Sequence, residues 1–177
     1  INMKISKSFK IYIHIICVFF LCQYLHADTD LSKNLIIHEK PQIIKELKFK
    51  DFNFQDIDLA NKKGNIMILN FWASWCLPCK REMSSLEKLA QNYPEVKIYP
   101  INMEKPNKLR ASDFYKSIGV TGLNIYFDPG FKLVKEFKMR GLPTSIIIDK
   151  NGMEFARVVG EIDFFSKDFI SFLEKNI

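Results

Sequence analysis

The sequence predicts one α/β domain in which a mixed central sheet is flanked by helices. The near-continuous apolar run at residues 66–72 is typical of a central strand that is covered on both faces. From residue 78 to 93, apolar side chains recur at spacings of three and four, as they do along an amphipathic helix. Strands and helices continue to alternate after this point, which favours a sheet with helices packed against it.

The elements around this central pair follow from their own apolar spacing and turn residues. Before the central strand we expect a lead-in at 28–46 with one short helix, and an extended segment at 49–57. After the first helix we expect a strand at 96–103, a helix at 109–118, a short strand at 124–128 and a helical stretch at 131–139. A hairpin of strands at 144–149 and 153–159 and an amphipathic helix at 163–176 complete the chain.

Composition limits the possible function classes. The 177 residues are 47% hydrophobic and 26% charged, as in a folded globular protein. The formal net charge of +6 includes Lys4, Lys7 and Lys10, so about half of it lies in the first 27 residues, which contain no acid. The remaining excess is spread thinly along the chain and provides no basic footprint for a nucleic acid.

The first 27 residues resemble a targeting segment. Three lysines precede an apolar stretch at 11–25, and Ala27 stands before Asp28. This pattern describes a secretory signal peptide, and an uncleaved N-terminal anchor that tethers the protein through residues 11–25 is the alternative. Both interpretations place the folded part outside the cytoplasm, in the periplasm or on the outer side of the cytoplasmic membrane. The predicted domains are therefore 1–27 as signal or anchor, 28–46 as lead-in and 47–177 as the folded domain.

Only two of the four cysteines, Cys76 and Cys79, lie beyond the targeting segment. A disulfide between them would close a very short loop, and the stabilisation that a disulfide supplies grows with loop length. The pair is therefore better suited to redox chemistry than to stapling the fold. Zinc would require further Cys or His ligands, but only His38 remains in the mature domain, so we expect no metal and no cofactor. The same shortage of histidine excludes a hydrolase with a catalytic histidine.

The position of the pair supports redox chemistry. Cys76 and Cys79 stand where a buried strand ends and a helix begins, with Pro78 near the helix start. The free N–H groups and positive dipole end of that helix favour a thiolate at Cys76.

Two separated motifs resemble the TlpA/ResA-type thioredoxin-like proteins. The segment from Phe71 to Glu82, FWASWCLPCKRE, is similar to the active-site segment of that family. The segment from Arg140 to Gly152, RGLPTSIIIDKNG, is similar to its cis-proline loop and the following strand. The resemblance spans residues 47–175 and implies a thioredoxin fold, with residues 119–139 as an insertion before the cis-proline loop.

The resemblance also implies an activity and partners. It predicts an extracytoplasmic thiol–disulfide oxidoreductase that reduces disulfides in partner proteins, in cytochrome c maturation or in assembly of the copper centre of cytochrome oxidase. A membrane thiol protein would supply electrons. An oxidant of the same fold, a copper-delivery or assembly protein and a non-catalytic binding domain are the alternatives. The copper protein would need soft or imidazole ligands that the sequence does not offer.

Supporting roles can be assigned to a few residues, each with a simpler alternative. Pro143 is interpreted as the cis-proline that faces the disulfide rather than an ordinary turn residue. Trp75 is interpreted as a surface residue beside the sulfur atoms rather than a core residue. Asn70 replaces the buried acid of plain thioredoxins or is only a polar residue satisfied within the sheet. Glu82 serves proton transfer in the family, and its alternative is an exposed residue favoured by the helix dipole.

Overall fold

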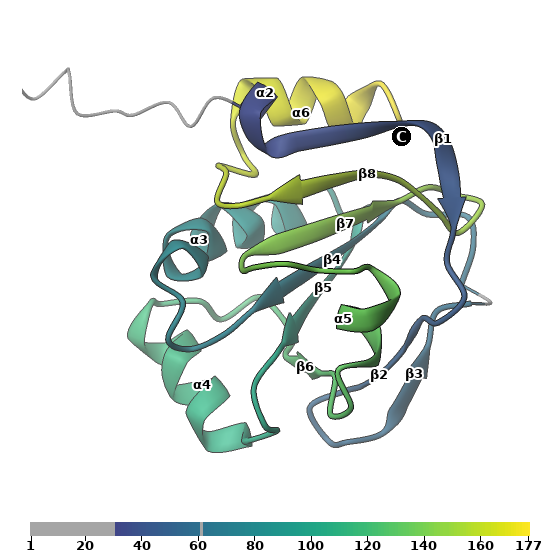
Figure 1. Ribbon diagram of the computed structural model, residues 1–177. Coiled ribbons are helices and arrows are strands. Elements are labelled where there is room, and N and C mark those ends of the chain that lie inside the picture. Colours follow the sequence, from purple (N-terminus) through teal and green to yellow (C-terminus); the bar gives the residue numbers. More distant parts are fainter. Residues whose placement is uncertain (1–30, 61) are drawn as a thin grey trace, which may run out of the picture.

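Eight strands form one mixed sheet in the order β1-β8-β7-β4-β5-β6-β2-β3 in the computed structural model, which describes residues 31–60 and 62–177 (Figure 1). The strands are β1 (Leu35–Ile43), β2 (Lys48–Lys50), β3 (Asp56–Asp58), β4 (Met67–Trp72), β5 (Lys97–Asn102), β6 (Tyr126–Phe127), β7 (Thr144–Ile148) and β8 (Met153–Val159). The helices are α2 (Leu31–Asn34), α3 (Leu77–Asn92), α4 (Lys108–Ser117), α5 (Lys132–Glu136) and α6 (Lys167–Glu174).

The central strand β4 is buried along its whole length because both faces of the sheet are covered. Successive side chains of a strand point to opposite faces. Ile68 and Trp72 accordingly join one apolar cluster with residues of α3, α4 and α6, whereas Leu69 and Phe71 join a second cluster with residues of α5. The apolar run that predicted a strand covered on both faces therefore has helices on each side.

The lead-in differs from its prediction. The sequence predicts one short helix within residues 28–46, but α2 occupies only four residues and β1 follows it directly. β1 pairs antiparallel with β8 as an edge strand of the sheet, with a break in register between Ile37 and Gln42. Pro41 lies in that break, where its missing N–H removes no ladder hydrogen bond.

The order of strands brings two distant segments to one end of the sheet. β4 runs parallel to β5 and antiparallel to β7, so the end of β4 lies beside the start of β7. The loop to α3 leaves β4 at this end, and the loop that carries Pro143 enters β7 there. The peptide bond between Leu142 and Pro143 is cis.

The predicted signal or anchor at 1–27 lies outside the described residues. Within residues 31–60 and 62–177, no helix has the length and apolar character to span a bilayer.

Candidate active site

Cys76 and Cys79 form a disulfide at the first turn of α3. Cys76 is the N-cap residue of the helix, and its sulfur accepts a hydrogen bond from the backbone N–H of Cys79 at 3.2 Å. A capping side chain normally satisfies one of the free N–H groups at a helix start, and here the sulfur atom does so. The same N–H and the helix dipole would stabilise a thiolate at Cys76 after reduction. Pro78 occupies a position in the first turn where no N–H is needed.

The two sulfur-bearing residues differ little in overall exposure, since Cys76 is 4% exposed and Cys79 is fully buried. Trp75 and Leu77, which flank Cys76, are 73% and 62% exposed. Trp75 is therefore a surface residue beside the disulfide and not part of the core. A partner protein that approached Cys76 would meet these two apolar side chains first.

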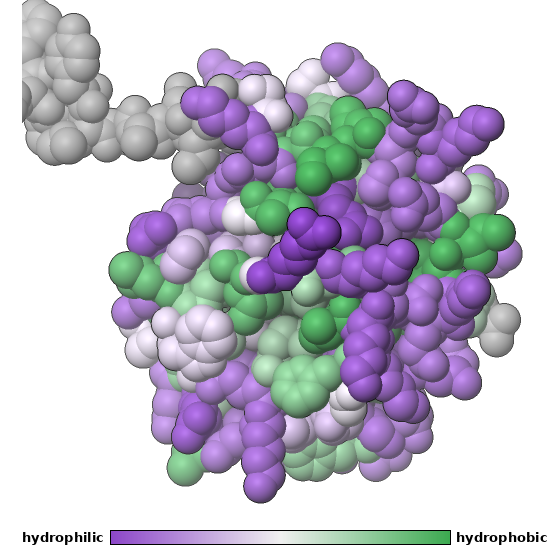
Figure 2. Space-filling model, viewed as in Figure 1, coloured by the Kyte–Doolittle hydropathy of each residue, from purple (hydrophilic) through white to green (hydrophobic). Residues whose placement is uncertain are grey.

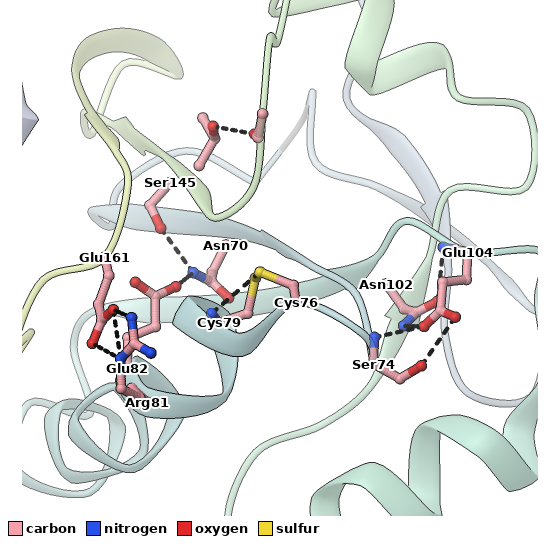
Figure 3. The surroundings of a disulfide bond; sticks show 12 residues. Asn70, Ser74, Cys76, Cys79, Arg81, Glu82, Asn102, Glu104, Ser145 and Glu161 are labelled. Carbon is pink, nitrogen blue, oxygen red and sulfur yellow. Dashed lines mark hydrogen bonds and ion pairs between the residues drawn. A yellow bond between two sulfur atoms is a disulfide. The ribbon is translucent and has the colours of Figure 1, made fainter.

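A buried polar network lies next to the disulfide (Figure 3). The Asn70 side-chain amide donates to the Glu82 carboxylate at 2.8 Å and to the Ser145 hydroxyl at 2.9 Å. Asn70 comes from β4, Glu82 from α3 and Ser145 from β7, so the network joins the three elements that surround the cysteines. Figure 3 shows Asn70 between the carboxyl group of Glu82 and the disulfide.

Glu82 is buried and not an exposed helix residue, with only 2% of its surface accessible. Burial raises the pKa of its carboxyl group to about 8, although hydrogen bonds from Asn70 and the backbone of Ile162 act against the increase. At neutral pH this carboxyl is therefore mostly protonated, with a minority in the charged form. One oxygen of Glu82 and the side-chain oxygen of Asn70 have no hydrogen-bond partner in the described protein. Asn70 is thus only partly satisfied within the sheet.

A second polar cluster holds the loop between β4 and α3. The Glu104 carboxylate accepts the backbone N–H of Ser74 at 2.6 Å and its hydroxyl at 3.0 Å. Asn102 and Arg110 also donate to this carboxylate. Partial burial favours a higher pKa for Glu104, but the hydrogen bonds from Ser74, Asn102 and Arg110 outweigh it and leave the pKa below its ordinary value. Glu104 is therefore a charged anchor for the loop two residues before Cys76.

Sequence reasoning did not identify Ser145 or Glu104. Ser145 follows the cis-proline loop by two residues and lies opposite Asn70 in the ladder between β4 and β7. Glu104 stands just beyond the end of β5, the parallel neighbour of β4. The available signal was a polar residue inside or directly after a buried strand, and it becomes informative only when the order of strands is known.

No group of three or more His, Cys, Asp or Glu side chains within residues 31–60 and 62–177 is arranged to hold a metal ion.

A cysteine pair at the start of the helix that follows the central strand, opposite a cis-proline loop, defines the thioredoxin-fold thiol–disulfide oxidoreductases. Residues 41–153 match the AhpC/TSA family. The thiol-disulfide oxidoreductase ResA of Bacillus cereus is 32% identical over 128 residues, which cover 70% of this chain and 73% of that protein. The chain belongs to the AhpC/TSA family and, within it, to the ResA-type thiol–disulfide oxidoreductases.

Solved structures agree with this assignment. StoA from Bacillus subtilis is 30% identical and superposes with a TM-score of 0.56 over 70% of this chain and 93% of its own. A DsbF homologue from Corynebacterium diphtheriae is 25% identical, with a TM-score of 0.67 over 83% of this chain and 96% of its own. The fold is therefore the thioredoxin-like α/β fold that the sequence predicted, and the protein is a thiol–disulfide oxidoreductase.

Proposed function

We propose that this protein reduces disulfides in exported partner proteins by dithiol–disulfide exchange. The observation that carries the proposal is the pair Cys76 and Cys79 at the start of α3, with the buried carboxyl group of Glu82 behind it. The sequence of residues 1–27 supports an exported location, either in the periplasm or on the outer side of the cytoplasmic membrane.

The exchange has two steps. The thiolate of Cys76 attacks one sulfur of the partner's disulfide, a mixed disulfide forms, and the partner's other sulfur leaves as a thiolate. Cys79 then loses its proton and attacks the sulfur of Cys76, which restores the Cys76–Cys79 bond and releases the partner's second thiolate. The partner gains two electrons and the enzyme loses two. A membrane thiol protein would return the enzyme to its dithiol form.

Glu82 is the proposed proton acceptor for Cys79. A thiol is a poor nucleophile until it loses its proton, and burial of Cys79 disfavours its thiolate. Asn70 cannot titrate. Glu82 lies on the same helix one turn further on, with one carboxyl oxygen lacking a partner in the described protein. A pKa of about 8 matches a base that works near neutral pH.

A trapping experiment tests the order of attack. In a Cys79→Ser variant the second step is blocked, so mixed disulfides between Cys76 and partner proteins should accumulate when the variant is exported in cells. The matched Cys76→Ser variant should accumulate far fewer. If Cys76→Ser traps partners equally well, Cys79 can begin the reaction and the proposed order is wrong. The trapped proteins would also show whether cytochrome c maturation or copper-centre assembly, as the family resemblance suggests, is the pathway served.

The direction of the reaction is tested by the reduction potential. A reductant should have a potential nearer to about −270 mV, as for thioredoxin, than to the value of about −120 mV of a strong oxidant. Equilibration with a dithiothreitol series and quantification of the free thiols of Cys76 and Cys79 would give the value. A potential near the oxidant end would support the alternative, a disulfide-forming oxidant of the same fold. If the reduced protein bound copper, the copper-delivery alternative would be favoured.

A further inference from the structure

An apolar groove of about 270 Å³ opens next to the cis-proline loop. One wall comes from α5 and the residue before it, the other from the loop that leads to Pro143, and the floor from the residue after β5. Its lining residues are Met103, Phe131, Val134, Met139, Arg140, Gly141 and Leu142. Apart from Arg140 these residues are apolar, so the groove offers a place for an apolar side chain rather than for a polar ligand.

The groove reaches the same end of the sheet as the disulfide. The backbone N–H of Met103 donates to the carbonyl of Trp72 at 2.9 Å, and Trp72 precedes Cys76 by four residues. On the other wall, Leu142 is bonded directly to Pro143 and packs against the core cluster that contains Cys76 and Cys79. A polypeptide segment whose disulfide lay at Cys76 could therefore continue along the cis-proline loop into the groove.

Phe131, at the edge of this groove, has an unusual backbone conformation. It is 46% exposed and adopts a left-handed backbone conformation, with φ of 51°, at the start of α5. A bulky residue rarely adopts this conformation, because contacts between its Cβ and the backbone make it unfavourable. The chain thus places an aromatic ring at the rim of the groove, in a conformation that Asn or Gly would adopt more easily.

The opposite side of α5 is cationic. Lys132 and Lys135 are exposed and stand three residues apart on α5, so they lie on one side of it, and Lys138 in the turn after α5 is exposed beside the same groove. They line a larger, open groove of about 830 Å³ between α5 and the segment that joins β1 to β2, together with Lys45 and Arg157.

The carboxylates of this larger groove offset only part of its positive charge. Its lining contains five Lys and Arg side chains against three carboxylates. Glu154 binds Arg157 and His38, and Glu136 accepts the backbone N–H of Lys45. Lys135 and Lys138 form no ion pair within residues 31–60 and 62–177. Figure 2 shows hydrophobic side chains between the loop after β4 and α5, and hydrophilic ones on the side of α5 toward β2.

We propose that these features form one docking track for a partner protein whose reactive cysteine is followed by an apolar residue and then by acidic residues. The apolar residue occupies the groove between Phe131 and Leu142, and the acidic residues lie over Lys132, Lys135 and Lys138. The proposal rests on the proposed disulfide exchange and specifies its substrate class. The lysines raise the rate of encounter with an acidic segment, because complementary charge steers association.

Synthetic peptides test the two parts of the track. In the reference peptide, a cysteine in mixed disulfide with β-mercaptoethanol is followed by Leu and by glutamates. One variant peptide has Gln in place of the glutamates, and another has Ser in place of Leu. The second-order rate constant for consumption of each peptide by the reduced enzyme is measured at low ionic strength. We expect the wild-type enzyme to prefer the reference peptide over the Gln peptide by about ten-fold and over the Ser peptide by several-fold.

Matched protein variants separate charge from apolar contact. Lys132→Glu combined with Lys135→Glu should abolish or invert the preference for glutamates, whereas Lys175→Glu, at the far end of α6, should keep it. High salt should reduce the preference of the wild-type enzyme for glutamates to the level of the lysine double variant, because the Debye length falls to about 3 Å at 1 M. Phe131→Asn should reduce the preference for Leu and leave the preference for glutamates unchanged. The backbone should tolerate this change, because Asn readily adopts the left-handed conformation required there.

Each remaining outcome has a defined meaning. If the wild-type enzyme exchanges with all peptides at equal rates, the docking track is wrong while the proposed function stands. If it exchanges with none of them, the proposed function itself fails. If Lys132→Glu with Lys135→Glu leaves the peptide preferences intact but dissociates a dimer, or abolishes sedimentation with phosphatidylglycerol vesicles, then the cationic side of α5 serves a second copy of the chain or a membrane, and the proposal is overturned.

Discussion

The proposed route for the Cys79 proton depends on single residues beside the disulfide. The Glu82 carboxyl is buried on α3, accepts one hydrogen bond from Asn70, and keeps one oxygen without a partner in the described protein. Burial disfavours the charged form, so its pKa is raised to about 8. In the proposed mechanism, this group accepts a proton when Cys79 attacks and returns it when the disulfide is reduced again.

The kinetic consequence is tested by Glu82→Gln, which preserves the shape of the side chain and removes its ability to titrate. We expect release of the partner from the mixed disulfide to slow by about ten-fold or more, because general base catalysis is lost. Attack by Cys76 should change less. Stopped-flow measurements with rapid acid quench separate the two steps, and Glu95→Gln, an exposed residue beyond the same helix, is the control. An unchanged release rate would remove Glu82 from the proton route.

The raised pKa of Glu82 also makes the stability of the protein depend on pH. Between the ordinary carboxyl pKa of 4.5 and the folded value of about 8, the folded protein binds a proton that the unfolded chain has lost. Stability should therefore fall as pH rises through this window, by an amount on the order of a few kcal/mol. Urea unfolding of the disulfide form should show a weaker decline in Glu82→Gln than in the wild type. Parallel declines would mean that Glu82 is not the group responsible.

The sequence located the reactive residues but not their environment. Cys76, Cys79 and Pro143 could be identified because their spacing and their strand and helix context carry the information locally. The buried state of Glu82 could not, because an acidic residue in the second turn of an amphipathic helix is equally compatible with an exposed position. Its burial depends on Asn70 and on the segment around Ile162, which is distant in sequence.

Elements around the site are connected through their loops. The loop from β4 to α3 carries Ser74 and Trp75, and Glu104 binds Ser74 from the segment after β5. The backbone of Glu104 is fixed in turn by the Asn102 side chain, which accepts its N–H at 3.0 Å. Since β4 and β5 are paired along their length, this contact fixes the loop against the rigid part of the sheet.

Removal of the Glu104 carboxylate should loosen the loop. In Glu104→Ala the backbone N–H of Ser74 loses its acceptor, and we expect a loss of about 1–3 kcal/mol in the free energy of unfolding. Hydrogen exchange of the Ser74 amide should accelerate more than exchange in β4. Glu174→Ala, which removes a surface hydrogen bond to Tyr93, is the control. Unchanged exchange at Ser74 would show that the carboxylate does not hold the loop.

Most elements were predictable because their apolar periodicity is strong, as in β4 and α3. The segment of β1 was not, because its sequence LIIHEKPQI mixes exposed apolar and charged residues without alternation. Its strand conformation comes from the ladder with β8, a partner more than a hundred residues away. An edge strand with a proline inside it therefore becomes visible only when the tertiary fold is known.

At the scale of the whole molecule, one buried charge cluster ties the edge of the sheet to the insertion. Glu154 on β8 accepts hydrogen bonds from Arg157 at 2.6 and 2.9 Å, and its carboxylate also lies 2.8 Å from the His38 ring on β1. Arg157 donates further to the carbonyl of Phe137, directly after α5. The cluster thus links β1 and β8 to the end of α5, the helix that lines both grooves.

The strength of this link can be measured by substitution. Side chains of Glu154 and Arg157 are 3% and 18% exposed, so removing either one leaves a largely buried charge without its partner. We expect Glu154→Gln and Arg157→Met each to lower the free energy of unfolding by about 3 kcal/mol, and the double variant to lose much less than the sum. Urea unfolding of all four proteins gives the coupling energy. The exposed pair Lys48 and Asp58 on β2 and β3, with side chains 62% and 40% exposed, is the matched control, and its coupling should be below about 1 kcal/mol. Equal coupling in the two pairs would mean that Glu154 stabilises the sheet no more than a surface ion pair does.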